Sequence, residues 1–261
     1  VAHDGHGHLL LCDTRNPVGE GKRMSIVKHE RIGDQTLLLG DCINVIPMLN
    51  EFDSLVTDPP YGIAGGSGTL GKASKKTKYN NTFPDTRDYI LETCVPAIKA
   101  ALEKVKVGAI TTGSNNLFLY PEPDDLGVIF QPAATGLSKW GRVTSQPVLF
   151  YGKDPRVGLT IQPKHIIQTK AAEACNHPCP KPIEVMNWLV TRTTLDNETI
   201  LDPFMGSGTT LVACQKLGRK GTGIELDPDY FEVACKRVDE AARQPDLFVK
   251  NPTKAKQGSM I

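Results

Sequence analysis

The chain has 261 residues, with 30 Lys and Arg against 29 Asp and Glu, so its formal net charge is +1. No stretch approaches the roughly 18 apolar residues that a membrane-spanning helix needs. Seven cysteines, an odd number, favour reduced thiols in the cytoplasm over a disulfide framework. Because the charges balance, nothing global indicates a nucleic-acid partner, and any such partner must be inferred from local features.

Both ends of the chain differ from its middle. Residues 1–23 have no helical or strand periodicity, and we expect a flexible leader there instead of a metal site built from its histidines and Cys12. Residues 244–261 are polar and contain prolines, and we expect a flexible tail. The regular pattern between these ends, over 24–243, predicts a single folded domain.

The first half of that domain predicts short strands and helices between turn signals. In chain order the predicted elements are a hairpin of strands Ser25–Arg31 and Gln35–Gly40, a helix Cys42–Leu49, a strand Ser54–Thr57, a long amphipathic helix Asp85–Val105 and a strand Val107–Thr112. In the first of these helices we expect Ile43, Ile46 and Leu49 to share the face that contacts the core.

The second half alternates strands and helices more strictly. Residues 115–170 are irregular, with one clear strand at Val148–Tyr151. The predicted elements that follow are helix Lys181–Thr193, strand Thr199–Asp202, helix Thr209–Leu217, strand Gly221–Glu225 and helix Asp229–Ala242. This alternation predicts an α/β fold, with a mostly parallel twisted sheet and helices on both faces.

A glycine-containing loop joins the predicted strand that ends at Asp202 to the helix that begins at Thr209. Gly206 and Gly208 let the backbone approach a ligand closely and direct helix N-terminal amides toward it. About 20 residues later, Glu225 ends the next strand, where a carboxylate can bind both hydroxyls of a ribose. The pair of features favours an adenosine-type cofactor over a purely structural turn.

Other cofactor and metal motifs fit less well. The loop lacks the third glycine of a dinucleotide fingerprint and the lysine of a phosphate-binding loop. The run Gly66–Ala73 approximates a phosphate-binding loop, but Ala73 stands where Ser or Thr must hold magnesium. Cys175, His177 and Cys179 match no zinc-finger spacing, so we expect no metal.

A second informative segment, Asp58-Pro59-Pro60-Tyr61, follows the predicted strand Ser54–Thr57. Consecutive prolines stiffen the backbone and leave carbonyl groups free to accept hydrogen bonds. A carboxylate, rigid carbonyls and an aromatic ring would suit a planar amine. Taken alone, the segment fits a Pro-rich turn that ends a strand better, because Asp-Pro turns are common.

Together, Asp58-Pro59-Pro60-Tyr61 and the loop from Asp202 to Gly208 resemble the DNA amino-methyltransferases that use S-adenosylmethionine. The catalytic segment precedes the cofactor loop in the chain. This order resembles that of the permuted β-class of the family. His177-Pro178-Cys179-Pro180-Lys181-Pro182 and Gly40-Asp41 extend the resemblance, which runs from about Glu30 to Val238. It implies a Rossmann-like methyltransferase fold for 24–243, with a small target-recognition region inside 115–175.

The resemblance implies a role for each matching residue. Asp58 and the Pro59 carbonyl would accept hydrogen bonds from the target amine, while Pro60 stiffens the segment and Tyr61 stacks on the flipped base. Glu225 would hold the ribose of the cofactor. The full set of implied cofactor contacts is Asp41 (adenine), Lys181 (near the methionine carboxylate), Asp202, Pro203, Phe204, Gly206, Gly208, Thr209 and Glu225 (ribose).

A basic segment follows the catalytic motif. Residues 62–81 contain no acid, and we expect their lysines to hold DNA phosphates, although a solvated loop is the alternative. Arg142 is a further candidate for DNA contact. The predicted lysine contacts are Lys72, Lys75, Lys76 and Lys78.

The leading hypothesis is a site-specific enzyme that methylates adenine N6 in DNA, with the target base flipped out of the duplex. Asp58 favours adenine, because family members acting on cytosine N4 more often carry Ser at that position. Alternatives are a cytosine-N4 enzyme, a catalytically silent DNA-binding subunit and a protein or RNA methyltransferase. The resemblance leaves a homodimer and a cognate restriction nuclease open as partners.

Overall fold

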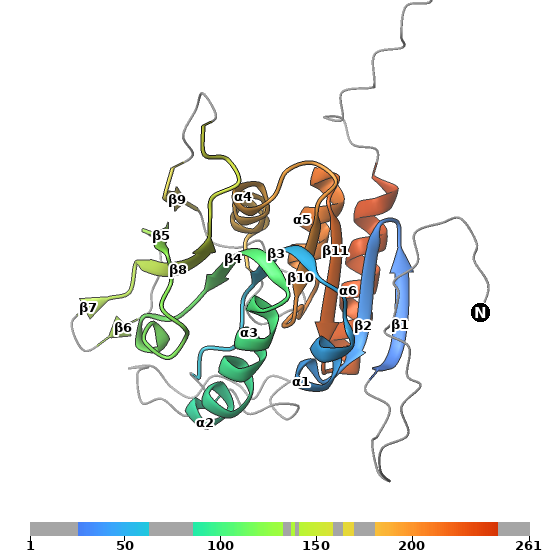
Figure 1. Ribbon diagram of the computed structural model, residues 1–261, viewed down its shortest axis with the longest axis horizontal. Coiled ribbons are helices and arrows are strands. Elements are labelled where there is room, and N and C mark those ends of the chain that lie inside the picture. Colours follow the sequence, from blue (N-terminus) through green and yellow to red (C-terminus); the bar gives the residue numbers. More distant parts are fainter. Residues whose placement is uncertain are drawn as a thin grey trace, which may run out of the picture.

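The computed structural model describes residues 26–62, 86–132, 137–138, 141–158, 164–169 and 181–244 (Figure 1). Several sequence-based predictions lie outside these residues, namely the leader 1–23, nearly all of the tail, the run Gly66–Ala73, the lysines Lys72, Lys75, Lys76 and Lys78, and the group Cys175, His177 and Cys179. Within the described ranges, none of the helices combines the length and apolar character that crossing a bilayer requires.

The described residues form a central sheet of nine strands in the order β1-β2-β11-β10-β3-β4-β8-β5-β9 (Figure 1). A separate short hairpin pairs β6 with β7. The strands are β1 (Ile26–Ile32), β2 (Gln35–Gly40), β3 (Phe52–Thr57), β4 (Val105–Thr111), β5 (Asp125–Phe130), β6 (Leu137–Ser138), β7 (Gly141–Arg142), β8 (Ser145–Gly152), β9 (Ile166–Gln168), β10 (Thr199–Asp202) and β11 (Lys220–Glu225).

The middle of this sheet is parallel. Strands β2, β11, β10, β3 and β4 pair in parallel with their neighbours, whereas β1 and β8 flank them as antiparallel strands. The carboxyl ends of the five parallel strands therefore meet at one edge, where open α/β sheets bind their ligands. Both motifs found in the sequence, after β3 and after β10, begin at this edge.

Helices cover both faces of the sheet, as predicted. Alternate residues of each strand point to opposite faces, so Leu38 and Leu55 pack with the helices α1 and α3, whereas Leu37 and Val56 pack on the other face with the helices α4 to α6. The helical elements are α1 (Cys42–Val45), α2 (Arg87–Tyr89), α3 (Val95–Leu102), α4 (Ile183–Thr193), α5 (Thr209–Leu217), α6 (Pro228–Arg243), a π-helical turn η2 (Ile90–Cys94) and 3-10 turns η1 (Ile46–Met48) and η3 (Ser114–Asn116).

The prediction for the face of the first helix is confirmed for Ile46 and Leu49 and wrong for Ile43. Ile43 is 37% exposed, whereas Cys42, Ile46 and Leu49 are buried together with Val45. The buried stripe therefore follows the i, i+3, i+4, i+7 spacing from Cys42, because a buried thiol packs as a small apolar group.

The long predicted helix over 85–105 is interrupted. A π-helical turn, Ile90–Cys94, separates α2 from α3, and Val105 already belongs to β4. Pro96 lies in the first turn of α3 and has no N–H to donate to the preceding turn, which accounts for the change of helical geometry just before it. Likewise α4 begins at Ile183, with Pro182 as its N-cap residue.

The segment 115–170 is more regular than its sequence indicates. Strands β5 and β9 extend the central sheet beyond β8. Gly127 in the middle of β5 weakens the strand pattern, yet a Cβ at this position would lie 2.6 Å from the Phe150 ring on β8. Only glycine fits there without displacing that ring. The residue that weakens the strand pattern in the sequence is therefore the one that lets β5 pack against Phe150.

Candidate active site

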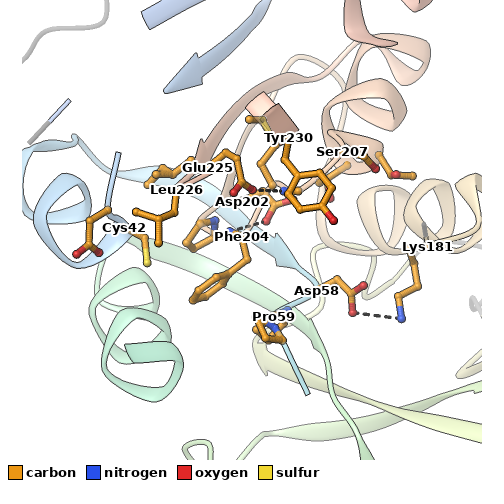
Figure 2. A pocket seen from close by; sticks show the side chains of 18 of the residues that line it. Cys42, Asp58, Pro59, Lys181, Asp202, Phe204, Ser207, Glu225, Leu226 and Tyr230 are labelled. Atoms are coloured by element: carbon orange, nitrogen blue, oxygen red, sulfur yellow. Dashed lines mark hydrogen bonds and ion pairs between the residues drawn. The ribbon is translucent and has the colours of Figure 1, made fainter. Parts of the chain in front are cut away.

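A cavity of about 290 Å³ lies at the carboxyl edge of the parallel strands (Figure 2). Residues 40–42, 58–61, 224–226 and most of 202–210 line it, together with Lys181 and a few helical side chains. The structure thus brings the two motifs of the sequence, separated by more than 140 positions, to one cavity.

The glycine loop after β10 has the backbone that its sequence predicts. Gly208 has φ +78°, and a Cβ there would lie 3.0 Å from the Ala234 Cβ on α6. Gly208 is absent from the cavity lining, unlike Gly206 and Thr209. It therefore supports the loop from behind, by letting α6 pack closely, and the other two residues face the cavity.

Glu225 lies at the end of β11, beside the glycine loop in Figure 2. Its carboxylate accepts hydrogen bonds from the backbone N–H groups of Gly206 and Asp227, each at 2.8 Å. Burial raises the pKa of Glu225 to about 7, despite these donors. The cavity thus contains an acceptor group whose charge is poorly solvated and which would gain from further hydroxyl donors.

Asp202 connects the two halves of the site. Its Oδ1 accepts a hydrogen bond of 2.6 Å from the Thr57 hydroxyl on β3 and one of 3.1 Å from the Phe204 N–H. Burial raises the pKa of Asp202 to about 6. Although Asp202 lines the cavity, these bonds fix the glycine loop to the residue that precedes Asp58.

Asp41 lines the cavity at the end of β2 and also begins α1. Its carboxylate accepts hydrogen bonds from the Ile43 N–H at 3.0 Å and from the Asn44 side-chain amide at 3.2 Å. These two bonds hold the carboxylate in place, and the first of them satisfies a backbone N–H group that helix geometry leaves unpaired.

The catalytic motif carries a dense polar network. The hydroxyl groups of Tyr61 and Thr111 both donate to Asp58 Oδ1. The Lys181 ammonium lies 3.2 Å from the same oxygen, as the dashed line in Figure 2 shows. Gln146 completes the network, since its amide nitrogen donates to the Tyr61 hydroxyl and its amide oxygen accepts from Lys181 at 2.9 Å.

The charges in this network are asymmetric. Burial lowers the pKa of Lys181, but the neighbouring Asp58 and Tyr61 outweigh it, so the net shift is upward and the ammonium stays charged. Burial and the Asp58 carboxylate raise the pKa of Tyr61, which keeps the phenol neutral. Asp58 therefore faces one cation and two neutral hydroxyl donors.

Lys181 lines the cavity and joins the network around Asp58. It contacts Asp58, Tyr61 and Gln146, and the predicted place near the methionine carboxylate of a cofactor stays a prediction. Thr111 and Gln146 were missed altogether. Their strands β4 and β8 contribute to the site only through non-local pairing, and no local motif indicates that pairing.

The remaining predicted residues are placed as follows. Pro59 is buried, and both it and Pro60 line the cavity, as do Pro203 and Phe204. Arg142 is exposed on β7 and is not among the lining residues. Tyr230 lines the cavity although the sequence did not single it out, because Asp227 caps α6 and directs its first turn there.

The sheet order, the strand-end cavity and the flanking helices define a Rossmann-like methyltransferase fold. A sequence family described as DNA methylase, of the N6 and N4 type, matches residues 124–236. This match covers less than half of the chain, and together with the relatives below it supports a DNA amino-methyltransferase.

Curated relatives agree with this assignment. Over 76 residues the chain is 42% identical to the type II methyltransferase M2.LlaDCHI of Lactococcus lactis subsp. cremoris, a match that covers 28% of each protein. A longer match, 24% identical over 242 residues, covers 79% of the chain and 74% of the type II methyltransferase M.HpaI of Haemophilus parainfluenzae.

Solved structures share the fold. The M1.HpyAVI–SAM complex superposes with a TM-score of 0.58 at 20% identity, over 78% of this chain and 99% of that one. The cytosine-N4-specific PvuII DNA methyltransferase superposes with the same TM-score of 0.58 at 17% identity, over 81% of this chain and 89% of that one.

Proposed function

We propose that this protein is a DNA methyltransferase that transfers a methyl group from S-adenosylmethionine to the exocyclic N6 of adenine. One observation carries the proposal: a single cavity contains both Asp58-Pro59-Pro60-Tyr61 and the glycine loop that begins at Asp202. Such a cavity can hold a methyl donor and a planar amine side by side. Proximity and orientation of this kind supply a large share of catalysis.

The chemistry of the lining fits S-adenosylmethionine. Glu225 is a buried acceptor at the strand tip where ribose hydroxyls would donate, and Asp41 offers a second carboxylate, for the adenine amine. Phe204, Gly206 and Thr209 would surround the methionine part, with Pro203 and Asp202 at its base. When bound, the cofactor supplies a methyl group on a sulfonium, which is already a strong electrophile.

Asp58 and the Pro59 carbonyl would act on the target amine. The lone pair of an exocyclic base amine is delocalised into the ring, so the amine is a poor nucleophile. Two acceptors placed out of the base plane favour a tetrahedral nitrogen and free that lone pair. The contact with the Lys181 ammonium holds the Asp58 carboxylate in place for this task.

The base has to displace an existing contact. Tyr61 donates its hydroxyl to Asp58, so an arriving amine takes over that acceptor while the Tyr61 ring stacks on the base. Lys181 and Gln146 remain to hold the displaced hydroxyl. Because the target atom is hidden in a duplex, the base must first leave the stack.

The proposal includes the choice of base. Asp58 supports adenine, since related cytosine-N4 enzymes more often carry Ser at that position. Methylation of cytosine N4 is the alternative, favoured by the fold shared with the cytosine-N4-specific PvuII enzyme. A silent subunit fits less well, because Asp58 and the glycine loop are both intact.

We further propose one catalytic domain over 24–243, with DNA as the partner. Within 115–175, the hairpin β6–β7 lies outside the central sheet and is the part best suited to target recognition. The names of the relatives favour a restriction–modification role, in which a cognate nuclease would recognise the same site.

Radiolabelled methyl transfer to defined DNA, followed by nucleoside analysis, tests the proposal. The expected product is N6-methyladenine at one sequence. The variant Asp58→Ala should lose transfer while cofactor affinity stays within about fivefold, because Asp58 acts on the amine and not on the cofactor. N4-methylcytosine as the product would select the alternative base. An equal loss of transfer and cofactor affinity would make Asp58 a structural residue.

A further inference from the structure

Phe118 is the most exposed large apolar side chain among the described residues. It is 91% exposed, and the next value is 70%, at Val27. Phenylalanine is usually found in protein interiors. A phenylalanine ring with this exposed fraction is therefore unusual.

The segment that carries Phe118 is well anchored. Asn116 is 3% exposed, its N–H donates to the Gly113 carbonyl at 2.9 Å, and its carbonyl accepts from the Leu119 N–H at 3.0 Å. On either side of Phe118, Leu117 and Leu119 pack against the core. The ring is thus held outward by fixed neighbours.

The same segment is bonded to the catalytic motif. The Asn116 side-chain amide donates to the Tyr61 carbonyl at 2.8 Å. A Cβ built on Gly113 would lie 3.8 Å from the Tyr61 Cβ. Two residues of chain span at most about 7 Å, so Phe118 stands close to the residue expected to receive the target base.

A cation lies at the same edge of the sheet. Arg142 is exposed on β7, only four positions before Gln146, which bonds to Tyr61. In Figure 1, β7 and the turn between β4 and β5 lie toward the same end of the sheet. An exposed arginine four positions from the Tyr61 network suits a phosphate contact, which positions a duplex without reading its sequence.

We infer that Phe118 inserts between base pairs next to the target base and stabilises the flipped state of the DNA. The inference rests on the proposed function. When a base leaves the stack, it leaves a gap and exposes the apolar faces of its neighbours. Apolar side chains placed between base steps offset part of that cost. Because Asn116 couples Phe118 to Tyr61, the ring that fills the gap and the ring that receives the base are held at a fixed spacing.

The test compares two DNA substrates that differ only in how easily the target base leaves the stack. One is a normal duplex carrying the methylation site of the enzyme. The other is the same duplex with an abasic position opposite the target base. Wild-type protein and the variants Phe118→Ala, Phe118→Trp and Val27→Ala are assayed on both, and cofactor affinity and melting temperature are measured for each.

On the normal duplex, Phe118→Ala should lower kcat/KM roughly 10-fold to 100-fold, the range that loss of one stacking contact allows. On the abasic duplex the loss should be within about threefold, because the target base has no pairing partner there and leaves the helix at a lower cost. Phe118→Trp keeps a stacking ring and should stay near wild type on both substrates. Val27→Ala removes a comparably exposed apolar side chain at the far edge of the sheet and should change neither rate.

Three outcomes would overturn the inference. Equal losses on both substrates would mean that Phe118 supports folding or general DNA affinity, and unchanged rates would make it an ordinary surface residue. If the wild-type protein methylates no DNA, the proposed function fails, and the inference fails with it. The first two outcomes leave the proposed function intact.

Discussion

The two sides of the cavity are built from different kinds of interaction. On the cofactor side, Asp202 and Glu225 are buried acids whose pKa values are raised to about 6 and about 7, and they bond mainly to backbone groups and hydroxyls. On the target side, Asp58 is surrounded by side chains and paired with the charged Lys181. Burial therefore works against negative charge on the cofactor side, whereas on the target side a cation lies next to the acid.

This difference matches the chemistry of what each side would bind. A ribose and an adenine amine offer neutral donors, so a weakly charged acid suffices for them. Activating an exocyclic amine needs a strong, well-oriented acceptor, and Lys181 keeps Asp58 in that state. The surroundings of the acids, and not their number, therefore separate the two tasks.

The largest effect is expected from a substitution on the target side of the cavity. Lys181→Met removes the cation beside Asp58 and should lower kcat roughly 100-fold or more, because loss of one preorganised electrostatic contact typically costs about 10²–10³ in kcat. Cofactor affinity, measured by calorimetry, should change less than about threefold. Lys181→Arg keeps the charge and should recover part of the rate. A loss of cofactor affinity as large as the loss of rate would move Lys181 to the cofactor side.

A second prediction concerns pH and the cofactor side. Burial raises the pKa of Glu225 from its ordinary 4.5 to about 7. Between these values the folded state holds a proton that the unfolded chain releases, so the free energy of unfolding should fall as pH rises through this window. The loss attributable to Glu225 is at most about 3 kcal/mol.

Denaturant unfolding at pH 5 and pH 8 measures that slope. Glu225→Gln should reduce it, with a residual slope from Asp202, whose pKa is also raised. Glu240→Gln, an exposed change on α6, should leave the slope as in the wild type. A slope that persists unchanged in Glu225→Gln would assign the pH dependence to other groups.

The smallest effect is expected from substitutions at two glycines, one of them in the glycine loop. Gly208 and Gly218 flank α5 and both have positive φ, but a Cβ at Gly208 would lie 3.0 Å from Ala234, whereas one at Gly218 would meet nothing within 4 Å. Gly218→Ala should cost about 1 kcal/mol of stability from backbone strain alone. Gly208→Ala should cost about 1–2 kcal/mol more, from overpacking, and should also weaken cofactor binding. Thermal unfolding and calorimetry of both variants test this prediction. Equal losses of stability and of cofactor affinity in the two variants would mean that close packing of Gly208 against α6 contributes nothing.

The sequence predicts these two sides unequally. The bounds of β10 and α5 agree with their predicted ranges, because a glycine loop, helix caps and strand alternation are local signals. Asp58 and Tyr61 were also predicted, from their own motif. Their partners Thr111 and Gln146 were not, since β4 and β8 meet only through antiparallel pairing far along the chain.

The same reason applies to the contacts of Lys181. A motif shows which residue is special but not which neighbour a long side chain will contact, and Lys181 reaches partners on two other segments. Gly127 illustrates the opposite case. It weakens the local strand pattern, and only the contact with Phe150 shows why a glycine stands there.

The hydrogen bond between Thr57 and Asp202 joins strands that are neighbours in space and remote in the chain. The site therefore depends on which strands are adjacent, and the order in which the polypeptide visits them is free to change. A gene rearrangement that moved the segment from β10 to α6 ahead of β1 would leave that pairing, and with it the pocket, in place. Modular exchange of the outer strands could then alter what the enzyme recognises while the chemistry is inherited unchanged.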